Sequence, residues 1–179
     1  GEESIVPLRG LRARLGVYAV LGNNDVAAGD DRVAAALARN GVRVLSNEAI
    51  QVGPLALGGL KGRLYGHSKW QKVRRETYDA LRRTPGVEVL IAHRPDEFVF
   101  APPPIRLVLA GHTHCGQIVL PLIGPLETGS DFGTRYLCGV VRSGTKVLVV
   151  TAGLGTSHVP LRIGAPPDIW LITVRGPNS

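Results

Sequence analysis

Two histidines one residue apart, His112 and His114, stand between an apolar run and a glycine in the stretch LVLAGHTHCGQIVLP. In an extended segment, residues two apart point to the same side, so both imidazoles would face one site. Imidazole nitrogens bind divalent metals and exchange hydrogen bonds. Taken alone, the pair is only a modest indication of a metal site, because a histidine after an apolar run is more often a hydrogen-bonded structural residue.

Two other apolar runs end on side chains that can bind metal. The run VYAVLGNND leads to Asn23, and VEVLIAHRPD leads to His93. In open α/β sheets the functional groups gather outside the carboxyl ends of the strands, so we expect these two residues to lie near the histidine pair. Four donors at three strand ends predict a metal site.

The elements that must position these donors are short strands and a few helices. A helix is expected to begin at Asp30 or Asp31, a cap residue, and to end at Asn40–Gly41. Region 122–144 is rich in glycine and indicates loops around a short hairpin. Helical patterns fall in the first half of the chain, which favours a mixed sheet covered by helices. The expected strands are Val17–Leu21, Val42–Leu45, Leu55–Leu57, Val87–Ala92, Arg106–Ala110, Gln117–Leu120, Lys146–Thr151 and Ile169–Val174.

Length and composition indicate one globular domain over residues 1–179. Hydrophobic residues make up 44% of the chain and charged residues 20%, which excludes a disordered protein. No apolar run approaches the roughly 18 residues that a membrane-spanning helix needs, and the N-terminus lacks the pattern of a signal peptide. The chain starts at Gly1 and contains no methionine, so an export signal or anchor upstream is left open. We expect a bacterial cytoplasmic or peripheral membrane location.

The net charge of +7 is concentrated in the basic segment 61–83. Its apolar residues recur at helical spacing and predict a helix with one buried stripe and a basic outer face. That face is interpreted either as an ordinary solvated surface or as a contact surface for phosphate groups or an anionic membrane. No nucleic-acid partner is expected, because aromatic residues are only 5% of the chain and the segment has no recognisable binding motif. The stripe is Trp70, Val73, Thr77, Ala80 and Leu81.

At the donor residues the sequence resembles a known family. The stretches GNND, AHRPD and GHTHCGQIVLP are similar to the later motifs of the calcineurin-like metallophosphoesterases. The closing GLGTSHVPLRIGAPPDIWLITV resembles a bacterial branch with YkuE-type phosphoesterases and UDP-2,3-diacylglucosamine pyrophosphatases. The resemblance runs from about Gly16 to Val174. It implies an α/β fold in which two mixed β-sheets are sandwiched by helices, in the order α/β/β/α.

The resemblance also implies a site and a reaction. Asn23, His93 and His112 would bind one divalent ion and His114 a second, with Mn, Fe or Zn as suitable ions. Such a pair of ions shares a hydroxide nucleophile and polarises the phosphoryl oxygens. The implied activity is hydrolysis of a phosphomonoester, a phosphodiester or a pyrophosphate. A lipid-linked substrate is a refinement, because the basic segment would suit peripheral contact with an anionic membrane.

The sequence departs from the family pattern upstream of the donors. The Asp-x-His and Gly-Asp-x-x-Asp motifs, which complete the metal shell in the family, are absent, and only 21 residues precede Gly22. The acidic run Gly29–Asp31 follows GNND and is interpreted as a helix cap. We therefore expect the C-terminal two thirds of a catalytic domain. The alternative function is a catalytically impaired metal-binding or scaffold domain of the same fold.

Three further residues are candidates for catalysis or substrate binding. Asn24 stands where the family has a histidine that acts on the leaving group, and an asparagine cannot deliver a proton near neutral pH. Arg162 could reach a phosphate with its guanidinium fork, although a surface arginine is an equal alternative. His158 is a candidate for substrate contact, with an ordinary loop histidine as the alternative.

Other residues near the histidine pair are expected to support the site. Thr113 and Gln117 are predicted to hydrogen-bond around it. Cys115 is interpreted as structural rather than as a soft metal ligand. The two cysteines of the chain, Cys115 and Cys138, are too few for a disulfide framework and lack the CxxC spacing of a zinc or redox pair.

Overall fold

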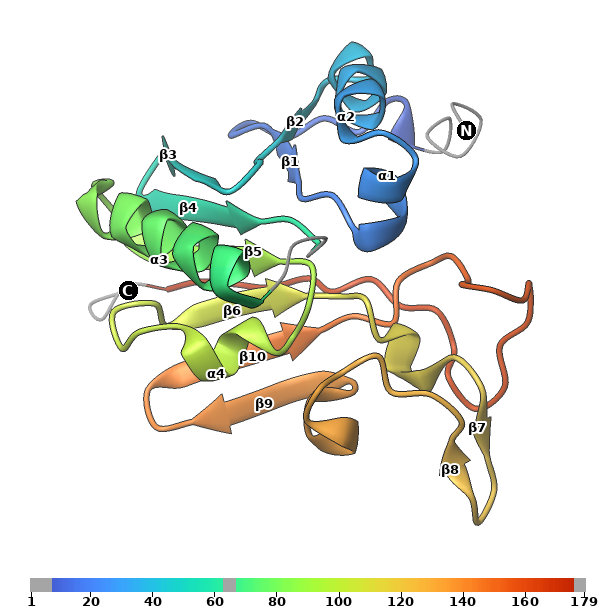
Figure 1. Cartoon of the computed structure of the whole chain (residues 1–179). Coiled ribbons are helices and arrows are strands. Elements are labelled where there is room, and N and C mark those ends of the chain that lie inside the picture. Colours follow the sequence, from blue (N-terminus) through green and yellow to red (C-terminus); the bar gives the residue numbers. More distant parts are fainter. Residues whose placement is uncertain (1–7, 63–66, 176–179) are drawn as a thin grey trace.

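The computed structural model describes residues 8–62 and 67–175 (Figure 1). The residues before position 8, those after position 175 and residues 63–66 of the basic segment lie outside this description. Among the helices of the described part, none combines the length and the apolarity needed to cross a membrane.

The largest sheet is mixed and has six strands. Its four central strands run parallel to one another, and one antiparallel strand closes each edge. A smaller sheet pairs β1 (Val17–Ala19) in parallel with β2 (Val42–Val44), and β7 (Val119–Leu120) forms a hairpin with β8 (Gly124–Pro125). In spatial order the six strands are β3 (Glu48–Val52), β4 (Leu55–Leu60), β5 (Val87–Ala92), β6 (Leu107–Ala110), β10 (Lys146–Val150) and β9 (Gly139–Ser143).

Helices cover the sheets on their outer faces (Figure 1). The N-terminal pair lies against the two-stranded sheet, and the other two helices lie against the six-stranded sheet. The helices are α1 (Asn23–Ala27), α2 (Asp30–Arg39), α3 (His67–Arg83) and α4 (Glu97–Phe100), and the 3-10 turns are η2 (His114–Gly116) and η3 (Gly133–Tyr136).

The alternation of side chains along the central strands shows how the layers stack. In β5, Leu90 packs in one core cluster with Leu81 of α3, whereas the neighbouring Val89 packs in another cluster with Tyr18 of β1. Successive side chains of a strand point to opposite faces, so β5 is buried on both. A third cluster joins β1 and β2 to α2. The layers are therefore α/β/β/α, which confirms the predicted fold class, although the smaller sheet is purely parallel rather than mixed.

Seven of the eight predicted strands are confirmed, although the strand predicted at Gln117–Leu120 is shortened to Val119–Leu120 because Gln117 lies in the preceding turn. Val87–Ala92 has the predicted bounds, and the strand predicted at Leu55–Leu57 extends to Leu60. The prediction of a strand at Ile169–Val174 is wrong: the segment has no strand pairing, and Ile169 is 81% exposed. Region 122–144 holds the regular edge strand β9 as well as loops, and β3 was not predicted. Edge strands such as these bury only part of their side chains and so give a weak apolar pattern.

Helix α3 carries the basic segment and buries the predicted stripe. Trp70, Thr77 and Leu81 are at most 3% exposed. Arg74, although in the basic face by sequence, forms an ion pair with the buried carboxylate of Glu97 at 2.7 Å. The basic surface is thus smaller than the sequence suggests.

The acidic run at residues 29–31 begins α2 as predicted, but the Asp30 side chain forms an ion pair instead of a cap hydrogen bond. The helix starts at Asp30, with Gly29 at the N-cap position. Asp30 accepts a hydrogen bond from the Lys61 ammonium group at 2.7 Å, and this ion pair lowers the pKa of the Asp30 carboxyl. The carboxylate therefore joins α2 to the end of β4.

Gly62 provides a test of how tightly β4 approaches the start of α1. Its N–H donates to the Leu21 carbonyl at 2.6 Å, and a Cβ at this position would lie 2.4 Å from the Asn23 nitrogen. We expect Gly62→Ala to lower the free energy of unfolding by roughly 1–3 kcal/mol because backbone must shift to admit the methyl group. Urea denaturation measures the change. Gly155→Ala is the matched control, since its added methyl would meet nothing within 4 Å; equal stability of the two variants would contradict the prediction.

Candidate metal centre

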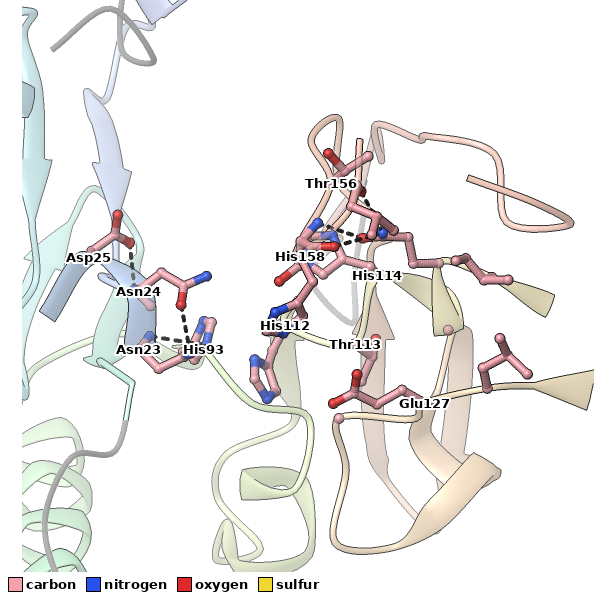
Figure 2. A pocket seen from close by; sticks show the side chains of 18 residues that line it. Asn23, Asn24, Asp25, His93, His112, Thr113, His114, Glu127, Thr156 and His158 are labelled. Atoms are coloured by element: carbon pink, nitrogen blue, oxygen red, sulfur yellow. Dashed lines mark hydrogen bonds between the residues drawn. The ribbon is translucent and has the colours of Figure 1, made fainter. Parts of the chain in front are cut away.

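A cavity of about 570 Å³ lies at the carboxyl ends of β5 and β6 and gathers the predicted donors (Figure 2). Asn23 and His93 lie on one side of it, His114 and His158 on the other, and His112 between them. Asn24 also lines the cavity. Of the residues predicted for the site, Arg162 is the one that does not line it.

The side formed by Asn23 and His93 is built by a close approach of backbone to imidazole. The His93 N–H donates to the Leu60 carbonyl at 3.0 Å, which continues the parallel ladder beyond β5. His93 Nε2 lies 2.8 Å from Asn23 Oδ1. A Cβ on Gly22 would lie 2.7 Å from the ring carbon Cε1 of His93, so a residue without a side chain is required there. The carboxylate of Asp25 accepts the Gly22 N–H at 2.8 Å and caps α1.

The histidine pair does not lie in an extended segment, so that part of the prediction is wrong. His112, His114 and Cys115 have positive φ values of 71°, 50° and 54°. L-residues adopt this left-handed region only at an energetic cost, and such residues cluster at functional sites. Both imidazoles nevertheless line the cavity, because the chain turns sharply after Gly111 instead of continuing β6. Apolar alternation in the sequence shows where a strand ends but not how the following loop turns.

Hydrogen bonds from the predicted supporting residues hold this turn. Thr113 Oγ1 donates to the Leu137 carbonyl at 2.7 Å. The Gln117 amide donates to the carbonyls of Ser157 and Val159 at 2.8 and 3.0 Å, and its oxygen accepts the Ser157 N–H at 2.5 Å. These contacts confirm the supporting roles predicted for Thr113 and Gln117. Gln117 thereby fixes the loop that carries His158.

A disulfide anchors the same turn. Cys115 is bonded to Cys138, 23 positions further along the sequence, and their Cα atoms are 4.8 Å apart. The structural role predicted for Cys115 is confirmed, but the pairing was not predicted, since two cysteines without characteristic spacing give no signal for it. The sulfurs and the Asp168 carboxylate lie within 4.8 Å of one another. Because the sulfurs are bonded to each other, this cluster is not a metal site.

Burial keeps the site histidines neutral. Desolvation, aided by the charges of His112, Arg94 and His114, lowers the pKa of His93 to about 3. The pKa of His112 is also lowered, first by burial and then by Arg94, and that of His114 first by burial and then by Arg162. A neutral imidazole has a free lone pair, so these side chains are available as metal ligands at neutral pH.

The donor set fits one divalent metal position better than two. Asn23, His93 and His112 are compact: Asn23 Oδ1 lies 2.8 Å from His93 Nε2, and the two imidazole centroids are 4.5 Å apart. Oxygen and imidazole donors of this kind suit Mn, Fe or Zn. Within residues 8–62 and 67–175, the histidines and carboxylates of the cavity form no group of three whose ligand atoms lie close enough together to hold a metal ion. The assignment of all four ligands therefore stays a prediction, with His114 as the isolated member.

Glu127 was missed by sequence reasoning. It lines the cavity, and its charge, together with that of Asp96, raises the pKa of His112 against the larger effects of burial and Arg94. It lies in a glycine-rich loop with no neighbouring motif, so the sequence gives no signal that distinguishes it from a surface carboxylate.

The remaining candidates lie in different settings. Asn24 is exposed at the start of α1, and its Oδ1 accepts a hydrogen bond from Asn23 Nδ2 at 3.2 Å. His158 is exposed on the far side of the cavity. Arg162 lies behind His114, with Nη2 3.4 Å from His114 Nδ1. The roles predicted for these three residues stay predictions.

The layer order and the donors gathered at the strand ends define the class of calcineurin-like phosphoesterase folds. The chain is similar to the uncharacterised metallophosphoesterase YkuE of Bacillus subtilis, with 30% identity over 99% of this chain and 63% of the relative. An uncharacterised metallophosphoesterase of Aquifex aeolicus is 31% identical over 94% of this chain and 64% of the relative. The phosphodiesterase YaeI of Escherichia coli is 34% identical over 47% of this chain and 31% of the relative.

These similarities support the metallophosphoesterase family for this chain. No family model matches the chain, and no solved structure matches it. The chain spans less than two thirds of the length of the relatives from B. subtilis and A. aeolicus, at 63% and 64%.

The lowered pKa of His93 predicts how stability depends on pH. Below its ordinary value of 6.5, the unfolded chain takes up a proton that the folded chain refuses until the pH reaches about 3. The free energy of unfolding must therefore fall on acidification, by up to about 1.4 kcal/mol per pH unit for this group. Urea denaturation in EDTA between pH 4 and 7 measures the slope. We expect a shallower slope in His93→Gln and an unchanged one in the control His158→Gln, whose side chain is exposed; equal slopes in all three proteins would contradict this.

Proposed function

We propose that this chain carries ligands of a dinuclear metal centre that hydrolyses a phosphomonoester, a phosphodiester or a pyrophosphate. The observation that carries the proposal is the convergence of Asn23, His93, His112 and His114 on one cavity, with the three imidazoles kept neutral by burial. The similarity to uncharacterised metallophosphoesterases supports it.

Each residue has a definite task in this proposal. Asn23, His93 and His112 would hold one ion, and His114 the second. Two divalent ions, when bound, activate a water molecule and neutralise charge on the phosphoryl group. The cavity walls orient the ester, with His158 and Asn24 able to donate hydrogen bonds to its oxygens from opposite sides. Arg94, whose charge lowers the pKa of His93 and His112, forms ion pairs with Asp96 and Asp131 and is given no role in substrate binding.

A refinement of this proposal is that the substrate is an ester linked to a lipid. Apolar side chains of Ile118, Leu126 and Val159 line the cavity, and Leu122 and Ile123 on the β7–β8 hairpin are exposed. An apolar margin of this kind supports a substrate with an apolar group next to its phosphate. Peripheral membrane contact through the basic segment 61–83 is a separate proposal. The ion pair between Arg74 and Glu97 leaves that segment one basic side chain fewer for such a contact.

A second candidate function is a metal-binding or scaffold domain with little activity. Two observations favour it: Asn24 cannot act as a general acid, and the described histidines and carboxylates of the cavity do not converge as a complete ligand set. Metal binding without hydrolysis distinguishes this function from the first.

Metal content and hydrolysis together test the proposal. After saturation with Mn²⁺ and desalting, two ions per chain in elemental analysis would support the dinuclear centre, whereas one ion would leave only the position of Asn23, His93 and His112. His112→Ala should lose at least one ion. The same preparations are assayed with bis(p-nitrophenyl) phosphate. Arg43→Gln, on the surface of β2, is the control for loss of a side chain remote from the cavity. Undiminished metal in His112→Ala would refute the ligand assignment, and metal without hydrolysis would favour the scaffold function.

Replacement of Asn24 gives a separate prediction about the leaving group. An imidazole can donate a proton to the departing oxygen, whereas an amide cannot. We expect Asn24→His to raise kcat for a phenyl ester by tenfold or more, on the order of the lower range for general acid catalysis. The gain should be small for a p-nitrophenyl ester, because nitrophenolate leaves without protonation. Equal gains for both esters would show that position 24 does not act on the leaving group.

A further inference from the structure

The guanidinium group of Arg162 is fully engaged by the protein backbone. Nε donates to the Gly155 carbonyl at 3.1 Å, and Nη1 donates to the carbonyls of His114 and Ala165, each at 3.1 Å. Nη2 donates to the carbonyls of Ala152 at 2.6 Å and Gly153 at 3.3 Å, and it also contacts Gly155. All five N–H groups of the arginine therefore have carbonyl acceptors.

This arrangement conflicts with substrate binding by Arg162. A guanidinium binds phosphate through two parallel N–H groups, which must be free to point at the ligand. Here the donors point at carbonyls of the chain, and Arg162 does not line the cavity. To bind a phosphate, the side chain would have to break several hydrogen bonds and leave buried carbonyls such as that of Ala152, which is 2% exposed, without a donor.

The same contacts place Arg162 directly behind a candidate metal ligand. It binds the main-chain carbonyl of His114, and its Nη2 lies 3.4 Å from Nδ1 of the imidazole. The imidazole also hydrogen-bonds the Ala152 carbonyl, which Nη2 shares. The Nδ1 edge of the ring thus faces the guanidinium, and the opposite edge, with Nε2, is the one available to a ligand.

We propose that Arg162 is a positioning residue that holds the His114 turn and directs Nε2 of His114 toward the cavity. It ties three segments together: the turn after β6, the segment after β10 at Ala152–Gly155, and the segment at Ala165. The positive φ of 50° at His114 needs such support, because this backbone conformation is unfavourable for an L-residue. The role of His114 as a metal ligand rests on the proposed function, whereas the contacts of Arg162 with His114 do not.

Conservative replacement separates positioning from substrate binding. Lysine keeps the charge and can still attract a phosphate, but its three donors cannot satisfy five carbonyls in one plane. We expect Arg162→Lys to weaken Mn²⁺ binding by roughly ten- to a hundred-fold, as for other residues that orient a ligand. We also expect it to shift the imidazole ¹⁵N signals of His114 in EDTA. Arg43→Gln is the control that removes an arginine from the surface, and it should change neither quantity.

The metal-free NMR readout keeps the two proposals distinguishable. If the wild-type chain binds no Mn²⁺, the proposed function fails, yet the ¹⁵N signals of His114 still test the positioning role. Unshifted His114 signals in Arg162→Lys would overturn that role, as would unchanged Mn²⁺ affinity accompanied by a raised KM.

A measurement on the wild-type chain covers the case in which Arg162→Lys does not fold. Inorganic phosphate is titrated into the metal-free and the zinc-loaded protein while the Nε–Hε signal of Arg162 is followed. A positioning residue keeps this signal in place, because its donors stay on the carbonyls. A shift that saturates with phosphate would show substrate contact and overturn the proposal.

Discussion

The parallel register of β4, β5, β6 and β10 is the constraint on which the rest of the structure depends. Parallel strands end at the same edge of a sheet, so donors that follow different strands are brought together without any direct sequence link. The ladder continues past the strand ends, with the His93 N–H bound to the Leu60 carbonyl, the Gly111 N–H to the His93 carbonyl and the Thr151 N–H to the Ala110 carbonyl. These hydrogen bonds fix the backbone at the point where each loop leaves the sheet. The cavity is therefore a product of strand pairing first and of loop structure second.

Burial at the carboxyl ends of the strands favours metal binding but lowers the stability of the fold in acid. Desolvation lowers the pKa of all three site histidines, which keeps their nitrogens unprotonated and ready for a cation. The same desolvation makes the folded chain unable to take up protons that the unfolded chain accepts, so acid favours unfolding. A bound cation would stabilise the folded state that presents the ligands, but it binds only unprotonated imidazoles, so the dependence of stability on pH would remain. The affinity for a cation and the stability of the fold in acid thus both depend on the burial of these histidines.

Sequence reasoning was accurate where burial on both faces makes an apolar run and weak where the chain leaves the sheet. The bounds of β5 and the gathering of Asn23, His93, His112 and His114 at one cavity follow from such runs and their polar ends, whereas the α/β/β/α layer order was implied by the resemblance to a known family. The left-handed turn at His112, the disulfide and the place of Glu127 depend on contacts between distant segments, which no local pattern encodes. Arg162 illustrates the difference: its side-chain chemistry was evident, but which acceptors it meets is decided by three loops at once.

The disulfide beside His114 links the site to the chemistry of its surroundings. Cys115 is 7% exposed and Cys138 is joined to it across the turn, so the bond is a covalent part of the wall behind a candidate ligand. Such bonds form and persist in oxidising compartments, whereas thiol buffers of the cytosol keep cysteines reduced. In an oxidising setting the backbone around His114 is cross-linked to the segment that precedes β9. In a reducing one it is held by hydrogen bonds, among them those of Arg162, Thr113 and Gln117. The rigidity of this wall is therefore a property of the compartment as well as of the sequence.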